Sequence, residues 1–315
     1  MTPWVGRAGT AEPGVRGVRG RRRGRPATLR REERRTAIAM VSPAVLLILA
    51  VAFLPVLYTI YLSLHDATVS STGGFVGLRN YADAFDDAVF REALANTGVF
   101  TVVSVTLELV IGLAIALAIN RRFRARGFVR TAVLLPWAFP VVVSALMWRL
   151  MLQDQVGIVT YLVGQLGLTD QPILSDRSSL MIAAIGVDVW KTTPFMALLL
   201  LAGLQTVPRE LAEAALVDGA TPVQRLFRIT LPLLKPAILV ALLFRTLEAW
   251  SVYDLFWVMS DRRLESLSTY VFEGVRVSQL QFSTGTAAAV MVFLGAIVIA
   301  LVFIKGFGTR TMEAD

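Results

Sequence analysis

Six long apolar segments alternate with polar stretches along the chain. A helix needs about 20 apolar residues to cross the hydrocarbon core of a membrane, and each segment reaches that length. Pro55 lies inside the first segment, and Pro136 and Pro140 lie inside the third, where a proline ring predicts a kink or a break. The pattern predicts an all-α, polytopic membrane protein with six transmembrane helices, at about residues 36–64, 94–120, 129–152, 179–203, 237–259 and 285–305.

The polar stretch between the fourth and fifth segments, residues 207–236, begins with a short helix pattern. Pro208 precedes this helix, and Glu210 and Glu213 suit the positive end of its dipole. Gly219 is placed to end the helix, because glycine adopts a positive φ without strain. One face of this helix is formed by Leu211, Ala214, Ala215 and Asp218. The two alanines on this face allow another surface to approach closely.

A second helix pattern follows the glycine. Thr221 and Pro222 suit the N-cap and the first turn of this helix. Pro232 is expected to end it, because proline cannot donate the backbone hydrogen bond that a helix interior requires.

The composition agrees with a membrane protein. Hydrophobic residues make up 55% of the chain, charged residues 17%, and the mean hydropathy is +0.63, which is too apolar for a surface covered by water. The chain has no cysteine and one histidine, His65. Disulfides, thiolate metal sites and histidine-rich metal sites are therefore excluded, and we expect no cofactor.

Positive charge is concentrated in residues 1–35, which hold eleven arginines and three glutamates. A basic tail can bind nucleic acid, but ahead of a long apolar segment it favours the cytoplasmic side of a membrane. Glycine and proline interrupt the tail, so we expect it to be disordered and loosely held at anionic lipid headgroups.

Lysine and arginine counts predict the orientation of the chain. The N-terminal tail, the turn after the second segment, the 207–236 stretch and the C-terminal end hold 11, 5, 4 and 2 of these residues. The three alternating loops hold 2, 1 and 3. Both termini, including the short end at 306–315, and the 207–236 stretch are therefore expected to face the cytoplasm.

The 207–236 stretch resembles the cytoplasmic EAA loop of ABC importer permease subunits. Glu213-Ala214-Ala215, Gly219, Ile229 and Leu231-Pro232 match that signature in type and spacing, although an ordinary helical hairpin would use the same residue types. In that family the loop is a coupling helix that docks into a cleft on a separate ATPase subunit. The resemblance implies this role for Glu210, Glu213, Ala214, Ala215, Asp218, Gly219 and Arg225.

Residues 75–85, 126–148 and 189–208 are similar to the sugar-importing branch of the same family. The chain is most similar to the first permease subunits of trehalose-type importers, within the maltose-type family. The additional N-terminal spans and the large external domain of longer maltose-type members are not visible. The resemblance implies the type I importer permease fold, a heterodimer with a second permease, two ATP-binding subunits, and an extracytoplasmic solute-binding protein.

Motifs for catalysis are absent from the sequence. It contains no G-x-x-x-x-G-K-[ST] phosphate loop, no G-x-S-x-G and no H-E-x-x-H. The polar loops are also too short for a separate catalytic domain. We therefore expect this chain not to be an enzyme and ATP hydrolysis to take place on a separate subunit.

Ionisable residues inside the segments cost about 2.5–3.5 kcal/mol each on insertion scales, so each requires a partner or a role. Asp188 and Lys191 are three residues apart, as are Arg245 and Glu248, and this spacing allows pairing on one helix face. Glu108 has no such local partner. It either makes a buried contact between helices or lines a cavity.

The fifth segment is the main candidate for solute contact. Trp250, Tyr253 and Trp257 recur at i, i+3 and i+7 and are predicted to form one stripe on the helix, with Asp254 beside it. Aromatic faces cover the apolar faces of a sugar and carboxylates bind its hydroxyls, whereas a membrane-interface belt is the alternative for the aromatic residues. The substrate-path candidates are Glu248, Trp250, Tyr253, Asp254, Glu108 and Lys191.

The sequence is compatible with three classes of function. The favoured one is a permease in the cell membrane for a disaccharide such as trehalose, with maltodextrin, another glycoside or glycerol phosphate as alternative solutes. The second is an ion-coupled secondary transporter or channel that binds its ion at Glu108, Asp188 or Glu248, although the two halves show no repeat. A polytopic membrane enzyme is the weakest reading.

Overall fold

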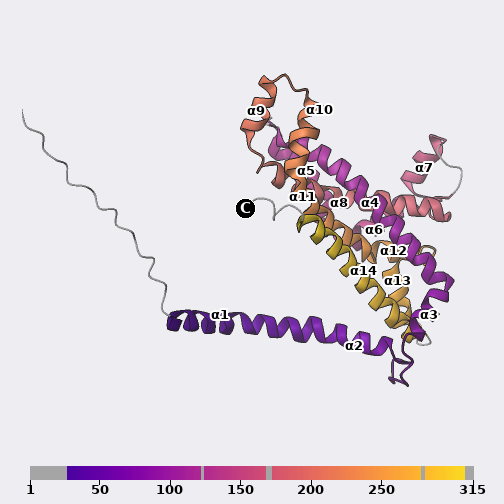
Figure 1. Cartoon of the computed structure of the whole chain (residues 1–315). Helices are drawn as coiled ribbons and strands as arrows, with labels where there is room; N and C mark the ends of the chain where they lie inside the picture. The colour runs from indigo at the N-terminus through magenta and orange to yellow at the C-terminus, as the bar shows by residue number, and fades with distance from the viewer. Residues whose placement is uncertain (1–26, 122–123, 168–171, 278–280, 309–315) are drawn as a thin grey trace, which may run out of the picture. The chain divides into compact units, whose positions relative to one another are not determined.

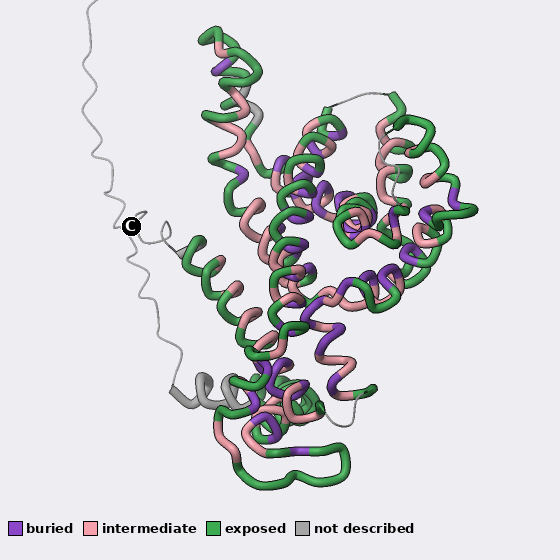
Figure 2. The backbone as a smooth tube through the Cα atoms, turned by 90° about the vertical axis from the view of Figure 1, so that its right-hand side faces the viewer, coloured by how far each residue is buried: buried purple, intermediate pink, exposed green. Residues whose placement is uncertain are grey.

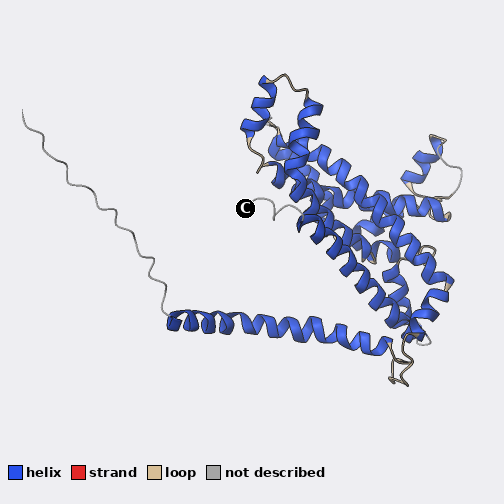
Figure 3. Cartoon of the chain, viewed as in Figure 1, coloured by secondary structure: helices blue, strands red, loops and turns tan. Residues whose placement is uncertain are grey.

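The computed structural model describes residues 27–121, 124–167, 172–277 and 281–308, and the regular elements in these ranges are helices (Figures 1 and 3). The chain divides into two compact units, Met1–Pro55 and Val56–Asp315.

The first unit contains α1 (Ala27–Ile48) and a π-helical turn, η1 (Leu49–Phe53), and its helix continues into α2 (Leu54–Ser63). Helix α1 begins within the stretch expected to be disordered, since the arginine, glutamate and leucine residues there are strong helix formers. The earlier part of the tail lies outside the described residues. The apolar run Thr36–Ser63 is long enough to cross a membrane, as predicted.

Three helices form the centre of the second unit. These are α4 (Ala88–Asn120), α8 (Arg177–Leu204) and α11 (Leu231–Trp250), and α14 (Phe282–Gly308) packs against α11. Figure 2 shows that buried residues gather where the central helices meet. Helices α4 and α8 approach closely at Gly112, where an added Cβ would lie 2.8 Å from the Met196 side chain.

The third predicted span is broken, as its prolines indicated. Helices α5 (Arg126–Ala138) and α6 (Val141–Met151) meet at an angle of 89°. Phe139 between them is extended, because the residue before a proline is driven out of the helical region. In the described part of the chain, five helices are long and apolar enough to cross a membrane, and this bent pair provides a sixth crossing if it forms one span.

The prediction that Pro232 ends the second short helix is wrong. Helix α10 (Pro222–Arg225) continues through a π-helical turn, η2 (Leu226–Thr230), into α11. The Leu231 N–H bonds the carbonyl of Leu226, five residues earlier, so the helix widens before the proline and Pro232 takes a first-turn position in α11. A single helical run therefore extends over Pro222–Trp250.

Short helices complete the second unit. They are α3 (Arg79–Asp86), α7 (Ile158–Gln165), α9 (Arg209–Val217), α12 (Asp254–Ser260), α13 (Leu267–Phe272) and η3 (Glu273–Val277). Tyr270 of α13 donates a 2.9 Å hydrogen bond to Asp87, the N-cap of α4, which joins these two elements. Burial of the Tyr270 hydroxyl beside this carboxylate raises the pKa of Tyr270.

Candidate functional site

Helices α9 and α10 form an arm at one end of the second unit, opposite α3 (Figure 1). Helix α9 ends as predicted, with Gly219 at φ +74°. The Ala220 N–H then bonds the carbonyl of Ala215 at 2.9 Å, and Thr221 forms a capping box with Gln224 at the start of α10. The bend of the arm is thus specified by local residues.

The arm presents most of the predicted coupling residues at its surface. Glu210, Glu213, Ala214, Asp218 and Gly219 are exposed, and Ala215 is buried. Leu216 and Val217 are also exposed, so the arm offers an apolar edge beside its acidic residues. The last of the predicted residues, Arg225, lies in α10 with a buried Nε that has no hydrogen-bond partner among the described residues.

A buried ion pair connects α4 and α11 in the centre of the unit. The Nε and Nη2 atoms of Arg245 donate to the two carboxylate oxygens of Glu108 at 2.6 and 2.7 Å. The side chains are 1% and 0% exposed, respectively. Thr192 of α8 donates a further 2.7 Å hydrogen bond to Glu108. Of the two alternatives for Glu108, the structure has the buried contact between helices, and Glu108 is not in the lining of the cavity described below.

Two further carboxylates surround the same guanidinium. Nη1 of Arg245 donates to Glu248 at 2.6 Å, which is the predicted i,i+3 pair. Nη2 also donates to Asp188 of α8 at 3.1 Å, so the ion-pair partner of Asp188 is Arg245 rather than Lys191. Arg245 thereby ties three helices together, and every nitrogen of its guanidinium is engaged by a carboxylate.

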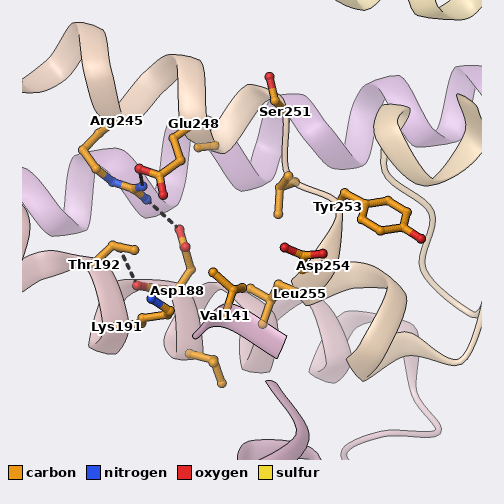
Figure 4. A pocket seen from close by; sticks show the side chains of 13 residues that line it. Val141, Asp188, Lys191, Thr192, Arg245, Glu248, Ser251, Tyr253, Asp254 and Leu255 are labelled. Carbon is orange, nitrogen blue, oxygen red and sulfur yellow. Dashed lines mark hydrogen bonds and ion pairs between the residues drawn. The ribbon is translucent and has the colours of Figure 1, made fainter. Parts of the chain in front are cut away.

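A cavity of about 150 Å³ opens beside this cluster (Figure 4). Four of the predicted substrate-path residues line it, namely Lys191, Glu248, Tyr253 and Asp254. Four other polar residues in the lining were not among the predicted substrate-path residues: Asp188, Thr192, Arg245 and Ser251. Two of these, Asp188 and Arg245, were recognised from the sequence as ionisable residues within apolar segments.

The predicted aromatic stripe does not form. Helix α11 ends at Trp250, residues 251–253 are not helical, and α12 begins at Asp254. Trp250 is outside the cavity lining and donates a 3.0 Å hydrogen bond from its indole to the carbonyl of Val292 on α14. Tyr253 stacks on Trp257 with 5.9 Å between ring centroids, and its ring points away from the charged cluster (Figure 4).

Comparison with known proteins identifies relatives along most of the chain. The family model described as binding-protein-dependent transport system inner membrane component matches residues 109–312. The trehalose transport system permease protein SugA of Mycobacterium tuberculosis is 42% identical over 288 residues, 89% of this chain and 91% of the relative. The trehalose/maltose transport system permease protein MalF of Thermococcus litoralis is 38% identical over 282 residues, 88% of this chain and 95% of the relative.

A solved structure supports the fold. It is a bacterial ABC transporter involved in the import of the acidic polysaccharide alginate, and one of its chains is similar with a TM-score of 0.73 at 23% identity. The match covers 90% of this chain and 99% of that chain.

Proposed function

The chain belongs to the family of binding-protein-dependent transport system inner membrane components and is a multi-pass membrane permease of an ABC importer, and on this premise we propose that it carries a disaccharide such as trehalose. The observation that supports this solute is the similarity to two permeases named for trehalose, each over nearly nine tenths of the chain. The permease itself is not an enzyme; its ATPase is a separate subunit.

The cavity suits such a solute chemically. Its carboxylates can accept hydrogen bonds from the hydroxyls of a sugar, and the hydroxyls in its lining can accept or donate them. Its volume of about 150 Å³ is below the roughly 300–1,000 Å³ of sites that enclose a small ligand. This supports a heterodimer in which a second permease supplies the rest of the path, and an extracytoplasmic solute-binding protein delivers the sugar.

We further propose that the α9–α10 arm is cytoplasmic and docks on one of two ATP-binding subunits. The helical run Pro222–Trp250 supports a rigid connection, because it begins in the arm and ends beside Glu248 at the cavity. Movement of the docked arm would then shift Arg245 and Glu248 relative to α4 and α8. The positive-inside distribution of lysine and arginine favours this orientation, with both termini in the cytoplasm.

An ion-coupled transporter is disfavoured by the same geometry. Glu108, Asp188 and Glu248 are all paired with Arg245, so the three carboxylates suggested as an ion site already have a cationic partner.

Reconstitution tests the proposed function. The chain is assembled in liposomes with a second permease, an ATPase and a binding protein encoded beside its gene, and uptake of labelled trehalose, maltodextrin and glycerol 3-phosphate is measured with and without ATP. We expect ATP-dependent uptake of trehalose. Uptake of a different solute alone would overturn the choice of trehalose, and uptake driven by an ion gradient without ATP would overturn the coupling scheme.

A further inference from the structure

The charges that line the cavity have an excess of carboxylates. Asp188, Glu248 and Asp254 face two cations, Lys191 and Arg245. The buried Glu108 lies directly behind Arg245 and adds another negative charge within hydrogen-bonding distance of the guanidinium. Even without Asp188, the carboxylates of Glu108, Glu248 and Asp254 outnumber the two cations, so a solute that enters the cavity meets a net negative environment.

Arg245 is not available to bind an anionic solute. A free guanidinium is the usual bidentate partner of phosphate or carboxylate groups. Here Nε, Nη1 and Nη2 donate to Glu108, Glu248 and Asp188 at 2.6–3.1 Å. The protein's own carboxylates therefore neutralise the Arg245 guanidinium. Lys191 is the second cationic side chain in the lining.

Asp254 differs from the other lining carboxylates. In the described ranges of the chain, its carboxylate has no side-chain hydrogen bond or ion pair, and no dashed line reaches it in Figure 4. It lies at the first position of α12, just after the break that follows α11. Two free carboxylate oxygens in this position can accept hydrogen bonds from sugar hydroxyls.

We propose that this cavity selects neutral polyhydroxylated solutes and rejects those that carry a phosphate, sulfonate or carboxylate group, with Asp254 as the main specificity-determining residue. The inference rests on the proposed import function and narrows its substrate class. The attractive element is hydroxyl binding by Asp254 and Glu248. The repulsive element is the placement of a solute anion beside carboxylates where Arg245 is already paired and Lys191 is only 7% exposed. Such repulsion is a common source of specificity.

The test compares two solutes that differ in one charged group, trehalose and trehalose 6-phosphate. Their binding is measured by calorimetry on the assembled importer without its binding protein, so that the selectivity of the binding protein does not enter. The variant is Asp254→Asn, which keeps the shape and removes the charge. The matched control is Asp86→Asn, an exposed aspartate on α3 that does not line the cavity.

We expect the wild-type importer and Asp86→Asn to bind trehalose 6-phosphate at least about tenfold more weakly than trehalose, as like-charge juxtaposition predicts. Asp254→Asn should reduce this ratio and weaken trehalose binding. Equal binding of both solutes by the wild type would overturn the proposal, as would an unchanged ratio in Asp254→Asn. If an uptake panel instead identifies another neutral sugar, trehalose is wrong but the charge selection stands, and the same comparison is made with that sugar and its phosphate. If the carried solute is anionic, the charge selection is overturned.

Discussion

Arg245 of α11 and Glu108 of α4 are 137 positions apart in the sequence and form a bidentate ion pair within the membrane-spanning part of the chain. Thr192 and Asp188 of α8 complete the arrangement. Buried charges of this kind are stable only when each has a hydrogen-bonded partner. The pair therefore holds the three central helices in one register.

Replacement of Glu108 by alanine should strongly destabilise the permease. The change leaves a buried guanidinium without its main partner, and loss of one member of a buried pair costs about 3–5 kcal/mol; Asp188 and Glu248 keep the effect toward the lower end. The measurement is thermal unfolding of the purified importer. Glu210→Ala, on the exposed face of α9, is the control and should change stability by less than about 0.5 kcal/mol. Equal melting temperatures for the two variants would contradict the structural role of the pair.

Gly112→Ala should destabilise the contact of α4 with α8. A Cβ there would lie 2.8 Å from Cγ of Met196 and 3.3 Å from a backbone nitrogen of α8, and overpacking of this kind costs about 1–3 kcal/mol. Gly98→Ala is a control in the same helix, because a Cβ at Gly98 meets no atom within 4 Å. Alanine there should leave stability unchanged or raise it by about 0.5–1 kcal/mol through helix propensity. Thermal unfolding is measured for both variants, and Gly112→Ala should melt at the lower temperature. The opposite order would contradict the prediction.

Gly219→Val should impair coupling to the ATPase without a steric clash inside the permease. No atom lies within 4 Å of an added Cβ, but φ of +74° is strained for a β-branched residue. The cost, about 1–2 kcal/mol, would distort the arm between α9 and α10. Gly219→Asn serves as the control, since asparagine tolerates this conformation. Co-purification of the ATPase and ATP-dependent uptake are measured, and full coupling in the valine variant would argue against docking through this arm.

Trp250→Phe should lower stability and leave solute affinity unchanged. The indole donates to the Val292 carbonyl, and its ring packs within 3 Å of the Cβ position of Gly295 on α14. Loss of one such hydrogen bond costs about 0.5–1.5 kcal/mol. Thermal unfolding and trehalose binding are compared with wild type. A change in affinity at unchanged stability would return Trp250 to the solute path and contradict its assignment to the α11–α14 contact.

The sequence by itself determined the features that depend on neighbouring residues. The apolar segments, the break at Pro136 and Pro140, and the bend at Gly219 all follow from hydropathy and local backbone preferences, and the structure has each of them. The EAA signature likewise lies within one short stretch, residues 213–232. It was therefore recognisable without knowledge of the packing.

The tertiary structure decided the features that depend on distant residues. Periodicity placed Trp250, Tyr253 and Trp257 on one helix, but α11 ends before Tyr253, where α12 leaves to pack against α6. Likewise, proline was predicted to end a helix at Pro232, but the π-helical turn before Pro232 keeps the helix continuous. The partner of Glu108 could not be predicted from i,i+3 spacing, because Arg245 comes near Glu108 only when α4 and α11 pack together. Local residue preferences determine where the helices form. Which helices pack together is decided by the free-energy cost of burying a charge without a partner.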